Sequence, residues 1–137
     1  MTSSPASTPP SAPAIPAADD LSLAAGDILF HEGEQGSDAY VILDGLMEIS
    51  RRVGTAEILL STCGSGEIIG EMALIEHMPR SATARALKPT VLRRLPQAEF
   101  DQLLASADPA LGTLLTRMAH IIRTLTDTIV RQTLGVR

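Results

Sequence analysis

The sequence predicts a mainly β domain that is closed by C-terminal helices. Between residues 20 and 95, short runs of alternating apolar and polar residues are separated by turn residues, of which Asp44-Gly45 is the strongest hairpin signal. Many short strands at this spacing are typical of a barrel, a roll or a sandwich. Beyond residue 95, apolar residues recur every three or four positions, which indicates helices. A chain of 137 residues can bury a single core, so we expect one folded domain.

Composition excludes several classes of function. The formal net charge of −5 and the pI near 5.1 argue against non-specific nucleic-acid binding through bulk charge. The single cysteine, Cys63, cannot form an intramolecular disulfide and lacks the partners of a zinc site, so we expect no metal. No apolar run has the length of a membrane span, and the N-terminus has no signal-peptide pattern. We therefore expect a soluble, cytoplasmic protein without membrane contact.

The N-terminal segment, residues 1–18, is rich in proline, serine, threonine and alanine. Such a composition cannot bury a core, so we expect a disordered tail before a folded domain over residues 19–137. The tail could act as a tether or as a docking peptide with polyproline character, or it could be a tolerated terminus without a role.

Residues 20–62 are predicted to form short strands joined by glycine-containing turns. The strands are expected at 21–23, 27–31, 39–43, 46–51 and 56–62. The turn glycines are Gly26, Gly33, Gly45 and Gly54, to which we assign no chemistry.

Residues 66–86, with the sequence GEIIGEMALIEHMPRSATARA, carry the candidate chemistry. A strand is expected to end at residues 67–69, and Gly70 permits a close turn. Residues 71–75 can then form a short helix, whose free N–H groups favour an anion.

The second half of this segment adds a charged group. Pro79 ends the helix, and Arg80 and Ser81 follow in extended chain before a strand over 82–86. One ligand could therefore meet a helix N-terminus, a guanidinium and a hydroxyl together. A guanidinium suits a phosphodiester, and the acceptor-only carboxylate of Glu71 suits a sugar hydroxyl.

This segment resembles the phosphate-binding cassette of cyclic-nucleotide-binding domains, whose pattern is roughly G-E-[ILF]-[IL]-G-E-x-[AG]-L followed by P-R-[STA]-A. Residues 26–45 also resemble the opening of that family's β-roll, with G-D-x-[IL]-F-x-x-G followed by A-Y-x-[IL]-x-x-G. The resemblance implies an antiparallel β-roll of the double-stranded jelly-roll type over about residues 19–95, with a short cassette helix. C-terminal helices are expected over about 96–134.

The resemblance also implies roles for individual residues. Glu71 would take the ribose 2′-hydroxyl of the ligand, and Arg80 would pair with its cyclic phosphate. Gly70 and Ala73 would give backbone contacts, and Ser81 would offer its hydroxyl to the phosphate.

The ligand implied is cAMP, because Ser81 stands where cGMP-preferring members often carry threonine; cGMP is the alternative. Met72 and Ala82 complete the cassette part of the candidate site. Leu60 and Ser61 are expected to line the base pocket, or else to be an ordinary core position and a solvent-facing serine on their strand.

Two helices are predicted after the last strand, which is expected at 90–95. The first spans residues 96–107. Asp108 is then the expected N-cap, and Pro109 the first residue, of a longer helix that ends near residue 134.

This long helix carries an apolar stripe with a 3.5-residue period, which predicts a coiled-coil seam and a homodimer; packing wholly against its own domain is the alternative. The stripe consists of Leu111, Leu115, Met118, Ile122, Leu125 and Ile129. Leu114 and Ile121 widen it enough to pack on the roll as well. By resemblance, the helix is a lid over the nucleotide base, and Thr126 is its base-contacting residue, with Thr124 and Asp127 as neighbours in the alignment.

The predicted function is that of a stand-alone cyclic-nucleotide receptor domain, in which cAMP changes the position of the C-terminal helix and an effector protein receives the signal. One alternative is a ligand-free interaction domain that docks through its acidic first 50 residues, its basic last helix and the tail. Another is a regulatory domain excised from a channel or a transcription factor.

Two departures from the family shape these expectations. Family members usually carry helices before the first strand, for which the tail leaves no room. Crp-like regulators continue into a helix-turn-helix after the long helix, whereas three residues follow Leu134, so we expect no direct DNA binding. We also expect no catalysis, because the sequence offers neither a metal-ligand set nor an activated nucleophile, and its three histidines stand apart.

Overall fold

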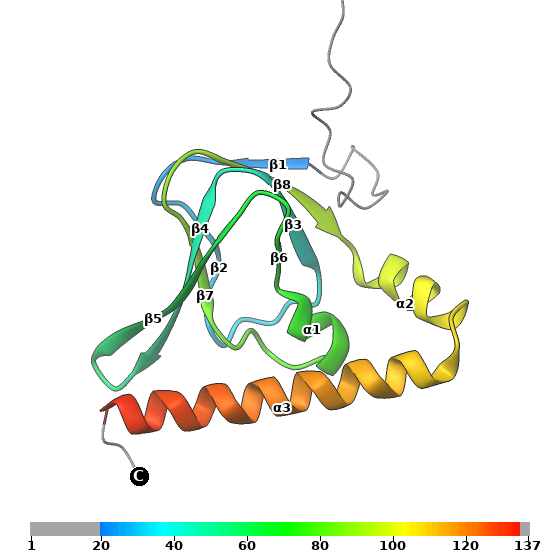
Figure 1. The fold of residues 1–137 in the computed structure, drawn as a ribbon. Coiled ribbons are helices and arrows are strands. Elements are labelled where there is room, and N and C mark those ends of the chain that lie inside the picture. Colours follow the sequence, from blue (N-terminus) through cyan, green and yellow to red (C-terminus); the bar gives the residue numbers. More distant parts are fainter. Residues whose placement is uncertain (1–19, 135–137) are drawn as a thin grey trace, which may run out of the picture.

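The computed structural model describes residues 20–134, so the predicted tail lies outside the described residues. Its elements follow the predicted order (Figure 1). The strands are β1 (Asp20–Leu23), β2 (Ile28–Phe30), β3 (Ala39–Asp44), β4 (Leu46–Val53), β5 (Ala56–Gly64), β6 (Ile68–Ile69), β7 (Thr83–Ala86) and β8 (Thr90–Leu95). The helices are α1 (Glu71–Glu76), α2 (Gln97–Ala105) and α3 (Pro109–Leu134).

The strands form two four-stranded sheets, with the orders β1-β8-β3-β6 and β2-β7-β4-β5. Every strand pair is antiparallel. Figure 1 shows the sheets curling into a roll, with α1 on one flank between the roll and α3. The predicted fold class, an antiparallel β-roll with a short cassette helix and C-terminal helices, is confirmed.

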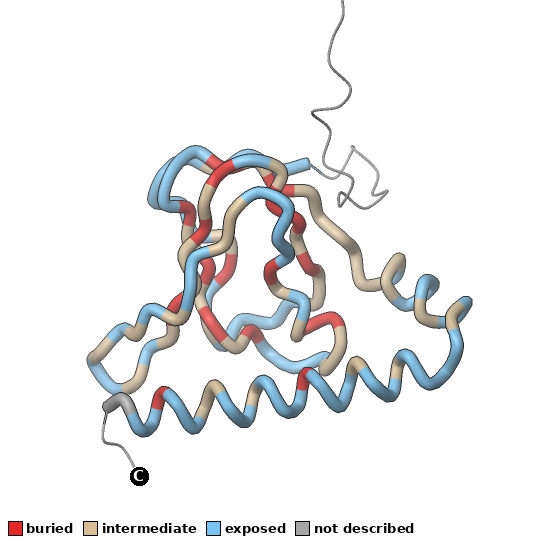
Figure 2. The backbone as a smooth tube through the Cα atoms, in the orientation of Figure 1, coloured by how far each residue is buried: buried red, intermediate tan, exposed pale blue. Residues whose placement is uncertain are grey.

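The core lies between the two sheets and is made of aliphatic and small side chains. Ile42, Met47 and Leu92 are fully buried, and alternate residues of β7, Ala84 and Ala86, point inward beside them. Since alternate side chains of a strand face opposite sides, the sequence TARA of β7 places its alanines inside and its polar residues toward solvent. Figure 2 shows the buried residues concentrated along the strands that face each other.

Helix α3 begins where the sequence predicts. Asp108 accepts a hydrogen bond from the N–H of Ala110 at 2.8 Å through its side chain, which caps the helix directly before Pro109. The helix runs along one side of the roll and packs against α1 and α2 (Figure 1), and its Ala119 and Val130 are buried. Within residues 20–134, no helix combines the length and the apolar character needed to cross a membrane.

One prediction about α3 is wrong. Leu114 and Ile121 were expected to pack on the roll, but they are 54% and 43% exposed. The side of the helix toward the roll instead carries the buried Ala119 and Val130, the paired Arg123 and Asp127, and residues of the cavity wall that include Ile122 and Ile129. The apolar stripe therefore stays largely open to solvent.

Candidate functional site

A cavity of about 410 Å³ lies between β5, the cassette around α1, and α3. This volume is in the range of pockets that hold small molecules. All ten residues that the sequence singles out as ligand contacts line this cavity. They are Leu60, Ser61, Gly70, Glu71, Met72, Ala73, Arg80, Ser81, Ala82 and Thr126.

Gly70 shapes the turn at which the cassette begins. Its φ of 78° lies in the left-handed region, which favours glycine, and a Cβ atom here would lie 2.8 Å from Nη1 of Arg80. The residue is therefore required both by its backbone conformation and by the close approach of the arginine. Helix α1 follows and ends at Glu76, where His77 adopts a left-handed conformation and donates its N–H to the carbonyl of Ala73 at 3.0 Å.

Arg80 is the central charged group of the cavity. It is 6% exposed, and its Cζ lies 4.1 Å from the centre of the Phe30 ring. Its Nη1 donates to the carbonyl of Gly70 at 3.5 Å, while its Nε is buried without a hydrogen-bond acceptor. Burial lowers the pKa of Arg80, an effect that nearby Tyr40 and Asp38 partly offset.

No carboxylate in the part of the chain that the structure describes lies within ion-pair distance of Arg80. A buried cation without an ion-pair partner is costly, since most of its hydration is lost and the more distant charges of Asp38 and Glu34 replace only part of it. An anionic ligand in the cavity would supply the missing partner. The electrostatics of the site thus favour a bound anion beside Arg80.

Glu71 is the first residue of α1 and lies in the wall of the same cavity. Its side chain is solvent-accessible, yet desolvation raises the pKa of its carboxyl group. Both observations fit a carboxylate in an open concave site, where protein atoms displace part of the surrounding water without covering the group. Within residues 20–134, Glu71 has no ion-pair partner, so its oxygens can accept hydrogen bonds from a ligand.

Strand β5 forms the opposite wall. Leu60 is half-buried and faces the cavity, while Ser61 is exposed but also borders it. Ser61 is therefore solvent-facing, as one alternative predicted. Leu60 and Ser61 also both lie where a ligand could contact them, as the other alternative predicted.

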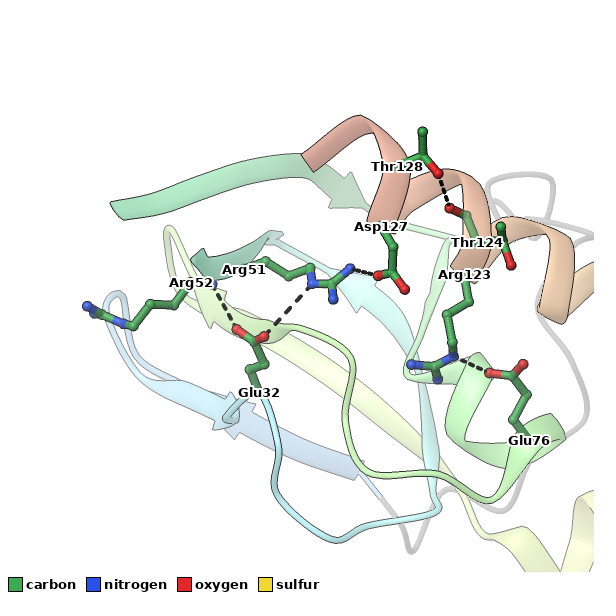
Figure 3. A network of polar contacts seen from close by, with 8 residues as sticks. All are labelled: Glu32, Arg51, Arg52, Glu76, Arg123, Thr124, Asp127 and Thr128. Atoms are coloured by element: carbon green, nitrogen blue, oxygen red, sulfur yellow. Dashed lines mark hydrogen bonds and ion pairs between the residues drawn. The ribbon is translucent and has the colours of Figure 1, made fainter. Parts of the chain in front are cut away.

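Helix α3 closes one side of the cavity and is held by two ion pairs (Figure 3). Nε of Arg123 lies 2.6 Å from Oε1 of Glu76 on α1, and Nη1 of Arg51 on β4 lies 2.5 Å from Oδ1 of Asp127. Nε of Arg51 also lies 3.8 Å from Oε2 of Glu32, so this arginine joins the loop after β2 to the helix. These contacts fix the helix over the cavity from two separate elements of the domain.

The three helix residues that the alignment grouped together are distinguished by the structure. Thr126 lines the cavity, whereas Thr124 is exposed and outside the lining. Asp127 is engaged with Arg51. The placement of Thr126 agrees with the prediction, although its contact with a base stays a prediction.

Sequence reasoning missed nine other residues of the cavity wall. These are Phe30, Ile49, Arg51, Cys63, Ile68, Ile69, Ile122, Arg123 and Ile129. One signal was available for Arg123, which stands three residues before Thr126 and so shares its helix face. Arg51 gave no such signal, because a charge near a hairpin tip is ordinarily a solvated surface group.

The histidines take no part in this site. His31 forms an exposed pair with Glu34, His77 contacts the side chain of Gln97, and His120 is exposed on α3. Residues 20–134 contain no group of three or more histidine, cysteine, aspartate or glutamate side chains that could hold a metal ion.

The sequence of this chain is similar to a known protein family and to individual proteins. A family model described as "Cyclic nucleotide-binding domain" matches residues 20–107. The chain is 34% identical over 82 residues to the cAMP-dependent protein kinase regulatory subunit of Debaryomyces hansenii, a match that covers 60% of this chain and 18% of that protein. It is 32% identical over 85 residues to lysophospholipase NTE1 of Chaetomium globosum, which covers 61% of this chain and 6% of that protein.

Similar solved structures include two forms of the EAL enzyme Bd1971. The cAMP-bound form matches with a TM-score of 0.73 and 31% identity, over 84% of this chain and 31% of that chain. The cGMP-bound form matches with a TM-score of 0.73 and 32% identity, over 83% of this chain and 31% of that chain. The chain thus spans less than a third of the length of each of these three relatives.

Proposed function

Because the chain belongs to the cyclic nucleotide-binding domain family, we propose that its cavity is a receptor site for a cyclic nucleotide, with cAMP as the preferred ligand. The observation that carries this proposal is Arg80, a buried guanidinium that lines the cavity and has no carboxylate partner among residues 20–134. The cyclic phosphate is a monoanion whose oxygens match the guanidinium fork. Since α1 has only six residues, the arginine rather than the helix dipole supplies most of the attraction.

The remaining contacts are those that the resemblance to the family implies. Glu71 accepts a hydrogen bond from the ribose 2′-hydroxyl, and Ser81 donates to the phosphate. The base lies toward Leu60 and Ser61 on β5 and toward Thr126 on α3. This arrangement is supported by the fact that all five side chains border one cavity.

The choice between cAMP and cGMP rests on Ser81 and is weaker than the choice of a cyclic nucleotide. Bd1971, which resembles this chain, has been solved with each of the two ligands. A titration must therefore compare both nucleotides. Tighter binding of cGMP would overturn the cAMP preference and leave the receptor role intact.

The role we propose is regulatory rather than catalytic. Helix α3 supplies part of the cavity wall, so a ligand contacts it directly and can shift its equilibrium position. The ligand must bind the state with α3 docked more tightly than any undocked state, or no signal results. An effector protein would then read the position of this helix.

A homodimer through α3 extends this proposal. Five of the six residues of the predicted stripe stay exposed along the helix, at Leu111, Met118, Ile122, Leu125 and Ile129, with Leu114 and Ile121 exposed beside them. A contiguous apolar face of this kind marks an interaction surface, and its 3.5-residue period is that of a coiled-coil seam. A second copy presenting the same face would cover it.

Isothermal titration calorimetry with cAMP and cGMP tests the receptor role. Wild type should give saturable heat with at least one of the two nucleotides, and Arg80→Ala should give none. Arg93→Ala is the matched control, because Arg93 pairs with Asp20 between β1 and β8 and does not line the cavity. Absence of heat with wild type at millimolar ligand would exclude sensing and favour the ligand-free interaction domain.

A further inference from the structure

Gly36 lies in the loop between β2 and β3, outside the cassette, and its backbone does not explain why it is glycine. Six glycines in the described chain have φ in the left-handed region, where other residues are strained. Gly36 is not among them. Another residue could therefore adopt its backbone conformation, and the reason for glycine must be sought in the space around it.

That space is occupied by the guanidinium of Arg80. A Cβ atom on Gly36 would lie 3.0 Å from Nε, 3.0 Å from Nη2 and 3.3 Å from Cζ of Arg80. These distances are shorter than an ordinary van der Waals contact, which is about 3.5 Å or more. By contrast, a Cβ on Gly64 would find its nearest atom at 3.9 Å, and one on Gly112 would find none within 4 Å.

Hydrogen bonds hold the loop between β2 and β3 in place beside Arg80. The N–H of Gly33 donates to the carbonyl of Arg80 at 2.7 Å, and the N–H of Arg80 donates to the carbonyl of Glu34 at 2.9 Å. The N–H of Glu32 donates to the hydroxyl of Thr83 at 2.9 Å, which ties the same loop to β7. On the other side of position 36, Asp38 accepts hydrogen bonds from Arg94 and from the N–H of Gln97. Because the loop is held on both sides, a side chain at position 36 would displace the guanidinium rather than the loop.

The guanidinium is also enclosed on its other sides. Gly70 lies so close that a Cβ there would be 2.8 Å from Nη1, and the Phe30 ring lies below Cζ at 4.1 Å. Two glycines and an aromatic ring thus define a slot of fixed dimensions. The slot fixes the direction in which Arg80 presents its donors to the cavity.

We propose that Gly36 is a positioning residue for ligand binding, because its missing side chain makes room for the Nε and Nη2 edge of Arg80. The loop between β2 and β3 is then a functional part of the site, although Gly36 itself does not line the cavity. This inference rests on the proposed function for its effect on affinity. Its effect on the arginine is independent of any ligand.

The test is Gly36→Ala, with Gly64→Ala as the matched control in the same roll. Displacement of the guanidinium weakens its charge-assisted hydrogen bonds to phosphate, so Kd for cAMP should rise by about tenfold in Gly36→Ala. The control should stay within about twofold of wild type, a difference well below the 1.4 kcal/mol of a tenfold change. An unchanged Kd in Gly36→Ala overturns the proposal.

A second measurement needs no ligand. The Nε–H nuclear magnetic resonance signal of Arg80, assigned by its loss in Arg80→Lys, should move in Gly36→Ala and stay in place in Gly64→Ala. If wild type binds no cyclic nucleotide, the proposed function fails, and this signal still decides whether Gly36 positions the arginine. A signal that does not move in Gly36→Ala contradicts the inference.

If Gly36→Ala lowers the stability of the protein, the double variant Gly36→Ala, Arg80→Ala shows whether the contact with Arg80 is the cause. In the Arg80→Ala background the new methyl group has room, so Gly36→Ala should no longer lower the melting temperature there. A decrease that persists without the arginine would show that the contact with Arg80 is not the reason for glycine at position 36.

Discussion

Replacing Arg80 by methionine separates its contribution to the fold from its contribution to binding. Methionine keeps an unbranched apolar chain over the Phe30 ring but removes the buried charge. The lost cation–π contact costs about 0.5–2 kcal/mol, and relief of the burial cost of an unpaired guanidinium offsets a loss of that size. We therefore expect the free energy of unfolding to change by no more than about 1 kcal/mol, or about 5 °C in melting temperature.

The effect on binding should be much larger. Two charge-assisted hydrogen bonds from the guanidinium to the cyclic phosphate contribute about 1.5–3 kcal/mol each. Their loss raises Kd by a factor of about 10² to 10⁴. Calorimetric titration with cAMP measures this change, and urea unfolding of the same samples measures stability.

Arg93→Met is the control for both measurements. Arg93 pairs with Asp20 on the surface, where such a pair contributes about 0–1 kcal/mol, so neither affinity nor stability should change much. The reasoning fails if Arg80→Met costs about 3–5 kcal/mol of stability, the loss expected from a broken buried ion pair, while affinity is retained. Arg80 would then be a structural residue.

Three further predictions follow from the site and from α3. Because burial raises the pKa of Glu71, its charged carboxylate is lost at a higher pH than that of a free glutamate as the pH falls from neutral through the raised pKa. Affinity for cAMP should fall in the same range, whereas Glu71→Gln should bind weakly without this dependence. Between the ordinary pKa of glutamate and the raised pKa of Glu71, the folded state keeps a proton that the unfolded state has released. The stability of the free protein should therefore fall as the pH rises through this range. Urea unfolding at several pH values measures this trend, and a flat or rising stability would contradict it. Asp127→Asn removes the ion pair with Arg51 and should cost at most about 1 kcal/mol of stability. Amide hydrogen exchange along α3 should become faster, and unchanged exchange would show that this pair does not hold the helix. The double variant Met118→Glu, Leu125→Glu should be monomeric by light scattering, and an unchanged dimer mass would refute the seam.

Much of the fold could be predicted because its signals are local. Alternating residues specify the strands, and Asp108-Pro109 marks the start of α3. Asp44-Gly45 marks the turn between β3 and β4, but the predicted hairpin there is wrong, because the chain passes at this turn from one sheet to the other and the two strands do not pair. The cassette was predicted for the same reason, since Glu71 and Arg80 stand only nine positions apart in a recognisable pattern. All ten candidate residues line the cavity, although their binding roles stay predictions.

The parts that could not be predicted depend on which faces meet in three dimensions. Arg51 has the pattern of an ordinary solvated charge until Asp127, 76 positions later, is placed beside it. The place of Arg123 on the helix face of Thr126 was predictable, but its pairing with Glu76 was not. The contact between Gly36 and Arg80 is equally hidden, because the two residues stand 44 positions apart.

The orientation of α3 shows the limit of periodicity. An apolar stripe indicates that a helix buries one face, but it does not say whether the cover is the same domain or another chain. Here the side toward the roll carries Ala119, Ile122 and Arg123, and Leu114 and Ile121 are left exposed.

The most direct test of the receptor assignment is a crystal structure of the chain with cAMP. Phosphate oxygens should lie about 2.7–3.2 Å from the guanidinium nitrogens of Arg80, and the ribose 2′-hydroxyl should lie at a similar distance from the carboxylate of Glu71. A nucleotide bound elsewhere, or one in this cavity whose phosphate turns to solvent away from Arg80, would contradict the account.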